Sequence, residues 1–127
     1  MFNYCYEGIK NQKVQADVGL HNLYIEGFLL HARILLEFFS DKQEKDTVII
    51  SHFLKDINRW NVIKKQIFKY LNDNNKKRLN KYLAHLTYTR LEDDKVWDHD
   101  TIYKEITNAW RNFCLLLQEE VKSLFMN

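Results

Sequence analysis

The stretch Leu20–Ser40, LHNLYIEGFLLHARILLEFFS, decides the fold of this chain. Its apolar side chains recur at helical spacing along two adjacent stripes, so most of the girth of the predicted helix is apolar. The remaining narrow line includes Arg33 and Glu37, which stand four residues apart and can pair on the helix surface. A helix with this pattern can bury its apolar surface only at the centre of a helical protein.

The rest of the chain also shows helical spacing. We predict helices near residues 3–18, 58–71 and 101–124, a short helix within 48–60, and a helix that follows a cap at Asp73 and extends to Arg90. The absence of proline and the presence of only three glycines disfavour the tight turns of all-β folds. The expected fold is all-α, an up-and-down bundle of four to five helices, with residues 1–127 forming a single domain.

The acidic stretch EDDKVWDHD, residues 92–100, precedes the final predicted helix. Asp98 or Asp100 can accept hydrogen bonds from the first amides of that helix. The periodicity predicts a buried stripe on this helix, with Trp110 beside it. The stripe consists of Ile102, Ile106, Ala109, Phe113, Leu116 or Leu117, and Leu124.

Charge is unevenly distributed along the chain. Residues 59–90 hold nine Lys and Arg against one acid, a net of +8, while the remainder holds ten bases and sixteen acids, a net of −6. A basic helical hairpin attracts phosphates through its field, so RNA or a nucleotide is the partner that we expect. The alternative is a solvated face that the acidic remainder neutralises.

Two histidines interrupt apolar helical runs. His31 lies in GFLLHARILLEFF and His85 in YLAHLTYTR, and each has an arginine nearby. Buried polar groups need partners, so these residues predict either a binding site or a buried polar network. The predicted network comprises His31, Arg33, Glu37, Thr87 and Arg90.

Arg78 and His85 are seven residues apart, nearly two helical turns, and therefore project from the same side of one helix. An arginine can hold a phosphoryl oxygen with paired hydrogen bonds, and a histidine can transfer a proton at neutral pH. Both actions are needed to cleave RNA. In the alternative interpretation, His85 bonds to a core carbonyl or hydroxyl group while Arg78 stays in solvent.

The segment from Arg78 to His85, RLNKYLAH, resembles the R-x(4–6)-H motif of the HEPN superfamily. The resemblance implies a helical bundle that dimerises so that both motifs line one cleft. It also implies either a metal-independent ribonuclease or a protein that only binds nucleotides. In such a ribonuclease His85 would transfer the proton, Arg78 would brace the scissile phosphate and Asn80 would orient the site. The residues that would position the strand are Lys76, Lys77 and Lys81.

A second resemblance covers residues 22–118. The stretches LLHARILLEFF, NKYLAHLTYTR and VWDHDTI are similar to those of a family of small uncharacterised bacterial helical-bundle proteins. This resemblance implies no activity, but it implies that the His31/Arg33 and His85/Arg90 sets recur together. The competing function class is therefore a non-catalytic module that forms a homodimer through aromatic-rich faces, with the histidines and arginines as a structural core network.

No stretch supplies the ligand spacing of a metal site, and His31 with His85 lacks a clear third ligand, so we expect no metal or other cofactor. Cys5 and Cys114 match no redox or metal spacing and are expected to be two buried thiols. With no export signal and no apolar run long enough to span a membrane, the expected location is the cytoplasm.

Overall fold

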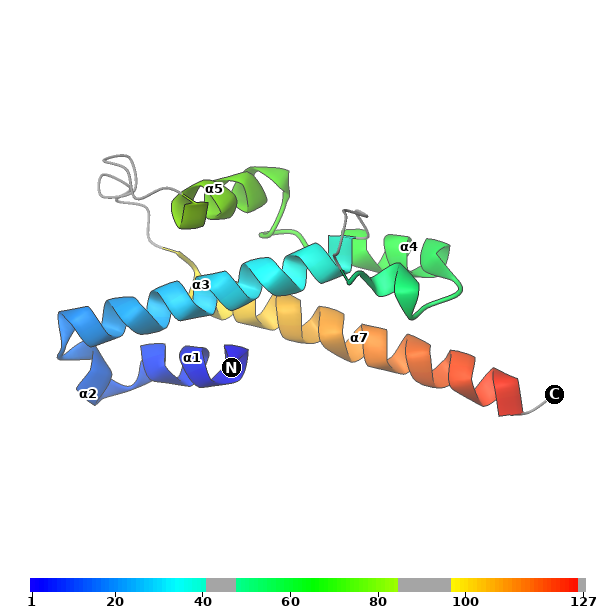
Figure 1. Ribbon diagram of the computed structural model, residues 1–127, viewed down its shortest axis with the longest axis horizontal. Coiled ribbons are helices and arrows are strands. Elements are labelled where there is room, and N and C mark those ends of the chain that lie inside the picture. The colour runs from blue at the N-terminus through cyan, green and yellow to red at the C-terminus, as the bar shows by residue number, and fades with distance from the viewer. Residues whose placement is uncertain (41–47, 85–96, 126–127) are drawn as a thin grey trace.

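The computed structural model describes residues 1–40, 48–84 and 97–125 of the chain, and this part is all-α, without a strand (Figure 1). The all-α prediction is therefore confirmed for the described residues. They form six α-helices and one 3-10 helix, η1. The elements are α1 (Phe2–Lys10), α2 (Gln12–Gln15), α3 (Val18–Ser40), η1 (Ile50–His52), α4 (Ile57–Ile67), α5 (Asp73–Ala84) and α7 (His99–Phe125).

Helix α3 is the central element, as its apolar girth predicts. It contacts α1, α2, η1, α5 and α7. Figure 1 shows α1 running antiparallel along the first half of α3, while α7 begins near the middle of α3 and continues past its C-terminal end. On the other side, α4 and α5 run back in the direction opposite to α3. Phe28, Leu29, Ala32 and Phe39 of α3 are fully buried.

The N-terminal segment forms two helices where one was predicted over 3–18. The break falls at Asn11, whose backbone is extended. Its side-chain oxygen accepts hydrogen bonds from the backbone N–H groups of Lys13 (2.9 Å) and Val14 (3.2 Å) and so caps α2. Asparagine competes with the helix for backbone hydrogen bonds, so it starts a new helix here instead of continuing the first.

The link between α4 and α5 also differs from the prediction. Helix α4 ends at Ile67, before the predicted limit of residue 71, and Phe68 leaves the helical conformation. Helix α5 is capped by Asn72, which accepts a hydrogen bond from the N–H of Asn75 at 3.0 Å, and not by Asp73, which is its first residue. Both residue types suit the cap position, so the sequence pattern does not separate them.

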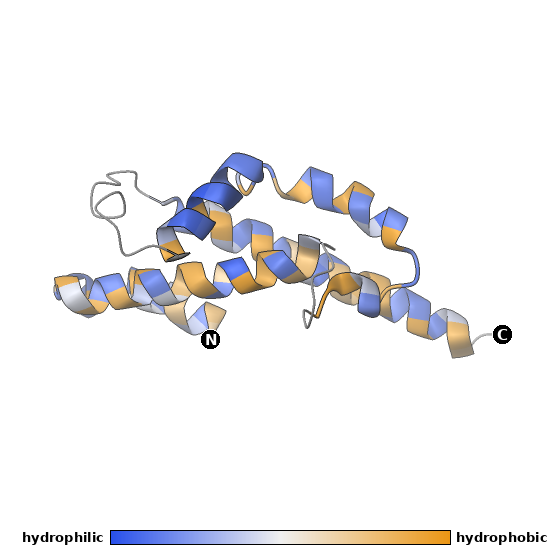
Figure 2. Cartoon of the chain, turned by 45° about the horizontal axis from the view of Figure 1, so that its top comes forward, coloured by the Kyte–Doolittle hydropathy of each residue, from blue (hydrophilic) through white to orange (hydrophobic). Residues whose placement is uncertain are grey.

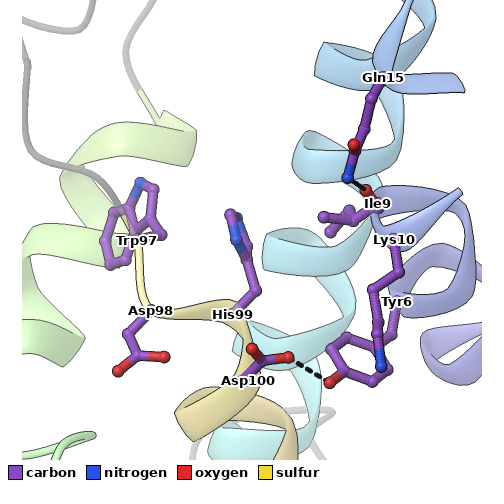
Figure 3. Close-up of a pocket in the computed structure, with 8 residues that line it drawn as sticks. All are labelled: Tyr6, Ile9, Lys10, Gln15, Trp97, Asp98, His99 and Asp100. Atoms are coloured by element: carbon purple, nitrogen blue, oxygen red, sulfur yellow. Dashed lines mark hydrogen bonds between the residues drawn. The ribbon is translucent and has the colours of Figure 1, made fainter. Parts of the chain in front are cut away.

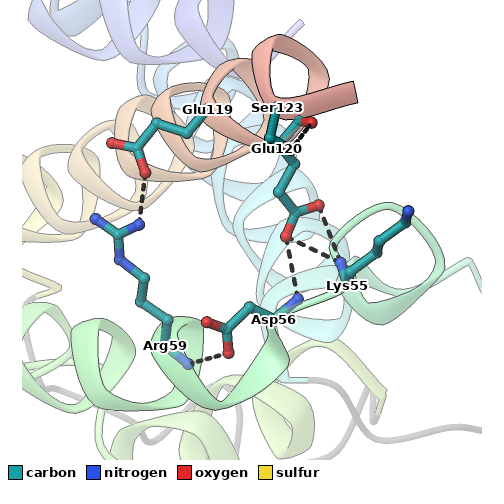
Figure 4. Close-up of polar contacts among 6 residues, drawn as sticks. All are labelled: Lys55, Asp56, Arg59, Glu119, Glu120 and Ser123. Carbon is teal, nitrogen blue, oxygen red and sulfur yellow. Dashed lines mark hydrogen bonds and ion pairs between the residues drawn. The ribbon is translucent and has the colours of Figure 1, made fainter. Parts of the chain in front are cut away.

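The C-terminal part of α7 holds the start of α4 in place (Figure 4). The Glu120 carboxylate accepts hydrogen bonds from the backbone N–H groups of Lys55 and Asp56, at 3.0 Å each. Arg59 pairs with Glu119 one turn into α4. A carboxylate at a helix N-terminus satisfies orphan donors and interacts well with the helix dipole.

The buried side chains form a contiguous core that runs through α1, α3, η1, α4, α5 and α7. Trp60 of α4 is fully buried, and its indole N–H donates to the carbonyl oxygen of Phe39 at 3.1 Å. In Figure 2 the apolar residues form stripes along the helices, and α5 is the most hydrophilic of them. The predicted stripe on the final helix is buried from Ile102 to Leu116, whereas Leu124 is exposed.

Candidate functional site

Arg78 lies at the junction of α5 and the start of α7. Its guanidinium carbon is 3.8 Å from the centroid of the Trp97 ring, the geometry of a cation–π contact. Trp97 is itself buried, and Tyr82 meets it edge-on with the ring centroids 5.8 Å apart. The Arg78 side chain is therefore ordered by an aromatic platform and does not simply extend into solvent.

The other predicted phosphate-binding residues lie on the same helix as Arg78. Lys77, Asn80 and Lys81 are exposed, whereas Lys76 is half-buried with its ammonium nitrogen 5.7 Å from the centroid of the Phe68 ring. Arg78 and the three lysines therefore all lie on α5, with Lys76 over Phe68 and Arg78 over Trp97. His85, Thr87 and Arg90 lie outside the described residues.

The described members of the predicted buried network lie on α3. Arg33 and Glu37 form the predicted i,i+4 pair, with Nε and the carboxylate oxygen 3.6 Å apart. Their side chains are 36% and 54% exposed, so this pair lies at the surface and not in the core. The Nε atom of Arg33 is nevertheless enclosed and has no hydrogen-bond partner among the described residues, so only the outer parts of the two side chains keep their hydration. His31 is half-buried on the same helix.

A pocket of about 450 Å³ opens beside the Arg78 platform (Figure 3). One wall consists of Tyr6, Ile9 and Lys10 of α1 with Gln15 of α2, and the other consists of residues 97–100 at the start of α7. Trp97 and His99 stand side by side and face Ile9 and Gln15 across the pocket. Trp97 thus belongs both to the Arg78 contact and to the pocket lining.

His99 is the unusual group in this pocket. Its Nε2 atom is enclosed and has no hydrogen-bond partner among the described residues, while its ring packs edge-on against Phe28 with the centroids 5.7 Å apart. Burial lowers the pKa of His99 below its ordinary value of 6.5, and the nearby His21 lowers it further. The imidazole is therefore neutral at pH 7 and offers one donor and one acceptor nitrogen.

The other polar groups of the pocket have intramolecular partners. Asp98 caps α7 through the N–H of Thr101 at 3.0 Å and its hydroxyl at 2.7 Å, which confirms the prediction that Asp98 or Asp100 starts this helix. The Tyr6 hydroxyl donates to Asp100, and this hydrogen bond is the main reason that the pKa of Tyr6 rises to about 12. Gln15 donates to the carbonyl oxygen of Ile9 at 3.0 Å.

Sequence reasoning did not identify this pocket. It singled out Arg78 but not Trp97 or His99, although both lie in the stretch VWDHDTI. A histidine between two aspartates at a helix start is a local signal, but the facing wall comes from residues 6–15, about 90 positions earlier in the chain. No local pattern reveals such a pairing.

No described group of three or more His, Cys, Asp or Glu side chains is placed to hold a metal ion. Within the described ranges, none of the helices combines the length and the apolar character that crossing a bilayer requires. In comparisons with known proteins, no family model, no curated protein and no solved structure matches this chain. Its function is therefore inferred from the chemistry of the site.

Proposed function

We propose that this chain binds RNA or a nucleotide through α5 and that Arg78 holds a phosphate. The observation that carries the proposal is the stacking of the Arg78 guanidinium on Trp97 at 3.8 Å. Stacking uses the face of the planar guanidinium, whereas bidentate phosphate binding uses the N–H groups at its edge. An arginine ordered in this way loses less conformational entropy when it binds a phosphate.

The lysines of α5 support a ligand with more than one phosphate. Lys77 and Lys81 are exposed and lie one and three residues from Arg78, and Lys76 lies two residues before it. Together these four cations give one short helix a strong positive field, which favours association with a polyanion.

The proposal extends to a HEPN-like bundle that cleaves RNA without a metal in the cytoplasm. In this extension His85 transfers the proton, Arg78 stabilises the charge that develops on the phosphate, and Asn80 orients the site. A homodimer would place two copies of these residues around one cleft. Two observations support this extension. The segment from Arg78 to His85 resembles the HEPN motif, and Arg78 lies beside a pocket.

Binding is tested by fluorescence anisotropy with a labelled single-stranded RNA and EDTA present. Arg78→Ala should weaken binding about tenfold or more, because a charge-assisted hydrogen bond contributes about 1.5–3 kcal/mol. Arg111→Ala is the matched control, since Arg111 is an exposed arginine on α7, and it should leave the affinity nearly unchanged. Replacing the three lysines with alanine should reduce the slope of log affinity against log salt concentration by about two, because each phosphate contact contributes about 0.7 to this slope.

Cleavage is tested by gel analysis of mixed RNA incubated with the wild type and with His85→Ala, with melting temperatures recorded for both. A catalytic His85 predicts that products disappear while the melting temperature stays the same. Binding without products would support the nucleotide-binding form of the proposal. Folded wild-type protein that neither binds nor cleaves would refute it.

An apolar groove favours the second candidate function, a non-catalytic module that forms a homodimer. The groove lies between α3 and α7, beside η1, and has a volume of about 740 Å³. Trp110, 48% exposed, stands at its rim, and Ile34 and Phe53 are about half exposed. One face thus carries both a hollow and a half-exposed aromatic side chain, a combination that suits the self-complementary interface of a twofold dimer.

Sedimentation velocity tests this alternative. Trp110→Glu should convert a dimer into monomers, whereas Leu115→Glu, at an exposed leucine of the same helix outside the groove, should not. A wild-type protein that stays monomeric across the concentration range would exclude the dimer.

A further inference from the structure

We propose that the pocket at the start of α7 binds the base of the same RNA or nucleotide, and that it prefers bases with an exocyclic amino group. This inference rests on the proposed function and specifies where the ligand lies relative to Arg78. The pocket volume of about 450 Å³ falls within the range of about 300–1,000 Å³ of small-molecule sites.

Trp97 connects the two subsites. It carries the Arg78 guanidinium and also lines the pocket, so a phosphate held by Arg78 would lie next to the pocket and not inside it. A nucleotide has the same arrangement, because its anionic group and its planar base are joined through the sugar. Trp97 and Tyr6 line the pocket, with Arg78 over the Trp97 ring and Tyr103 stacked on the Tyr6 ring, so they give a base an apolar wall and not an open stacking platform.

The charges inside the pocket favour a base over a phosphate. Asp98, Asp100 and Lys10 line it, so the carboxylates outnumber the one ammonium group and the net charge of the lining disfavours an anion. A carboxylate oxygen can accept more than one hydrogen bond, so the existing bonds from Thr101 and Tyr6 leave acceptor capacity for an amino group. Adenine, cytosine and guanine carry such an amino group, whereas uracil does not.

His99 supplies the second recognition element. Its Nε2 atom has no partner among the described residues, which is an unfavourable state for a buried polar atom. Figure 3 shows the imidazole directed into the space between Trp97 and Ile9. A base that enters the pocket can provide the missing hydrogen bond once the imidazole rotates about its side-chain bonds.

The test uses nucleosides, which carry no phosphate and therefore report on the pocket independently of Arg78. Adenosine, cytidine, guanosine and uridine are titrated into the full chain by calorimetry, and the imidazole resonances of His99 are followed by NMR. We expect the three amino-bearing nucleosides to bind and to shift the His99 resonances, with uridine about tenfold weaker or undetected, the effect of one lost hydrogen bond to a charged group.

His99→Phe separates a binding role from a structural one. Phenylalanine retains a ring of similar size and removes the unpartnered nitrogen, so the melting temperature should stay the same or rise while nucleoside affinity falls about tenfold. His52→Phe, at an exposed histidine of η1, is the control and should not change the affinity.

Each result is decisive for the pocket. Nucleoside binding that favours amino-bearing bases and falls in His99→Phe supports it. RNA binding that depends on Arg78, without nucleoside binding and without an effect of His99→Phe, overturns the pocket and leaves the proposed function in place. Equal affinity for uridine and adenosine overturns the specificity, and absence of both RNA and nucleoside binding overturns both proposals.

Discussion

Glu105 provides the sharpest test of how this fold is held together. It lies on α7 between Ile102 and Ile106 and is only 9% exposed. Its carboxylate accepts hydrogen bonds from the backbone N–H of Tyr70, at 2.9 and 3.2 Å, and from that of Leu71 at 3.4 Å. These donors belong to the link between α4 and α5, so Glu105 joins α7 to this link. We predict that Glu105→Ala destabilises the whole protein.

The size of the effect follows from the two backbone N–H groups, of Tyr70 and Leu71, that lose their acceptor. A buried N–H group that loses its acceptor costs about 1–3 kcal/mol, so two cost about 2–6 kcal/mol. Part of this loss of unfolding free energy is offset, because the wild type already bears the cost of desolvating the Glu105 carboxylate. The same burial raises the pKa of Glu105. We therefore expect Glu105→Ala to lose about 2–4 kcal/mol of unfolding free energy, and Glu105→Gln, which keeps one acceptor oxygen, to lose about 1 kcal/mol.

The pH dependence gives an independent check. Desolvation raises the folded-state pKa of Glu105 above its ordinary value of 4.5, against the backbone hydrogen bonds that lower it. A carboxyl group shifted in this direction contributes stability that is fully present below pH 4.5 and is lost as the pH rises through the folded-state pKa. The difference in unfolding free energy between the wild type and Glu105→Gln should therefore shrink as the pH rises above 4.5.

Urea denaturation followed by circular dichroism measures these quantities at a series of pH values that begins at about 4 and rises to about 7. A loss below about 0.5 kcal/mol in Glu105→Ala, the size of an ordinary surface substitution, would refute the role of Glu105 as acceptor. A difference between wild type and Glu105→Gln that grows with pH would refute the direction of the pKa shift.

Three further predictions test the packing and the polar contacts. In Gly8→Ala the new methyl group would overlap the ring of Tyr24, so thermal melts should show a loss of about 1–3 kcal/mol, whereas Gly19→Ala, with only an ordinary contact to meet, should be neutral or stabilising. Glu120→Ala removes the acceptor for the N–H groups of Lys55 and Asp56, just before α4, and should cost about 1 kcal/mol in urea denaturation, with no loss contradicting this role of Glu120. Ultraviolet titration should detect a tyrosine that ionises near pH 12, and Tyr6→Phe should remove that step.

The fold could be predicted where burial alone decides it. The apolar girth of α3 predicted a central helix over 20–40, and the helix spans Val18–Ser40 with neighbours on several sides. The final helix, predicted over 101–124, spans His99–Phe125. In both helices the periodic burial of many side chains specifies the element, so a single residue has little influence on the outcome.

The boundaries between helices could not be predicted with the same accuracy because single hydrogen bonds set them. Asn11 divides α1 from α2, and Asn72 starts α5 one residue before the predicted cap. At the start of α5 the neighbouring residues Asn72 and Asp73 both suit the cap position, whereas Asn11 interrupts a segment whose apolar spacing by itself predicts one helix. Tertiary contacts act at the end of α4 at Ile67, because the N–H groups just beyond it bond to Glu105 of a distant helix.

Glu105 and His99 explain why the candidate site was harder to predict than the core. Both are polar groups near the start of α7 that the fold shields from water, although charged residues stand beside both in the sequence. Glu105 meets backbone donors and has a structural role, whereas the Nε2 atom of His99 meets no partner in the described part of the chain. An unsatisfied buried nitrogen lowers stability, so its retention at the wall of a pocket is more consistent with ligand binding than with packing. That distinction depends on which groups the fold brings opposite each side chain, and residue spacing carries no information about it.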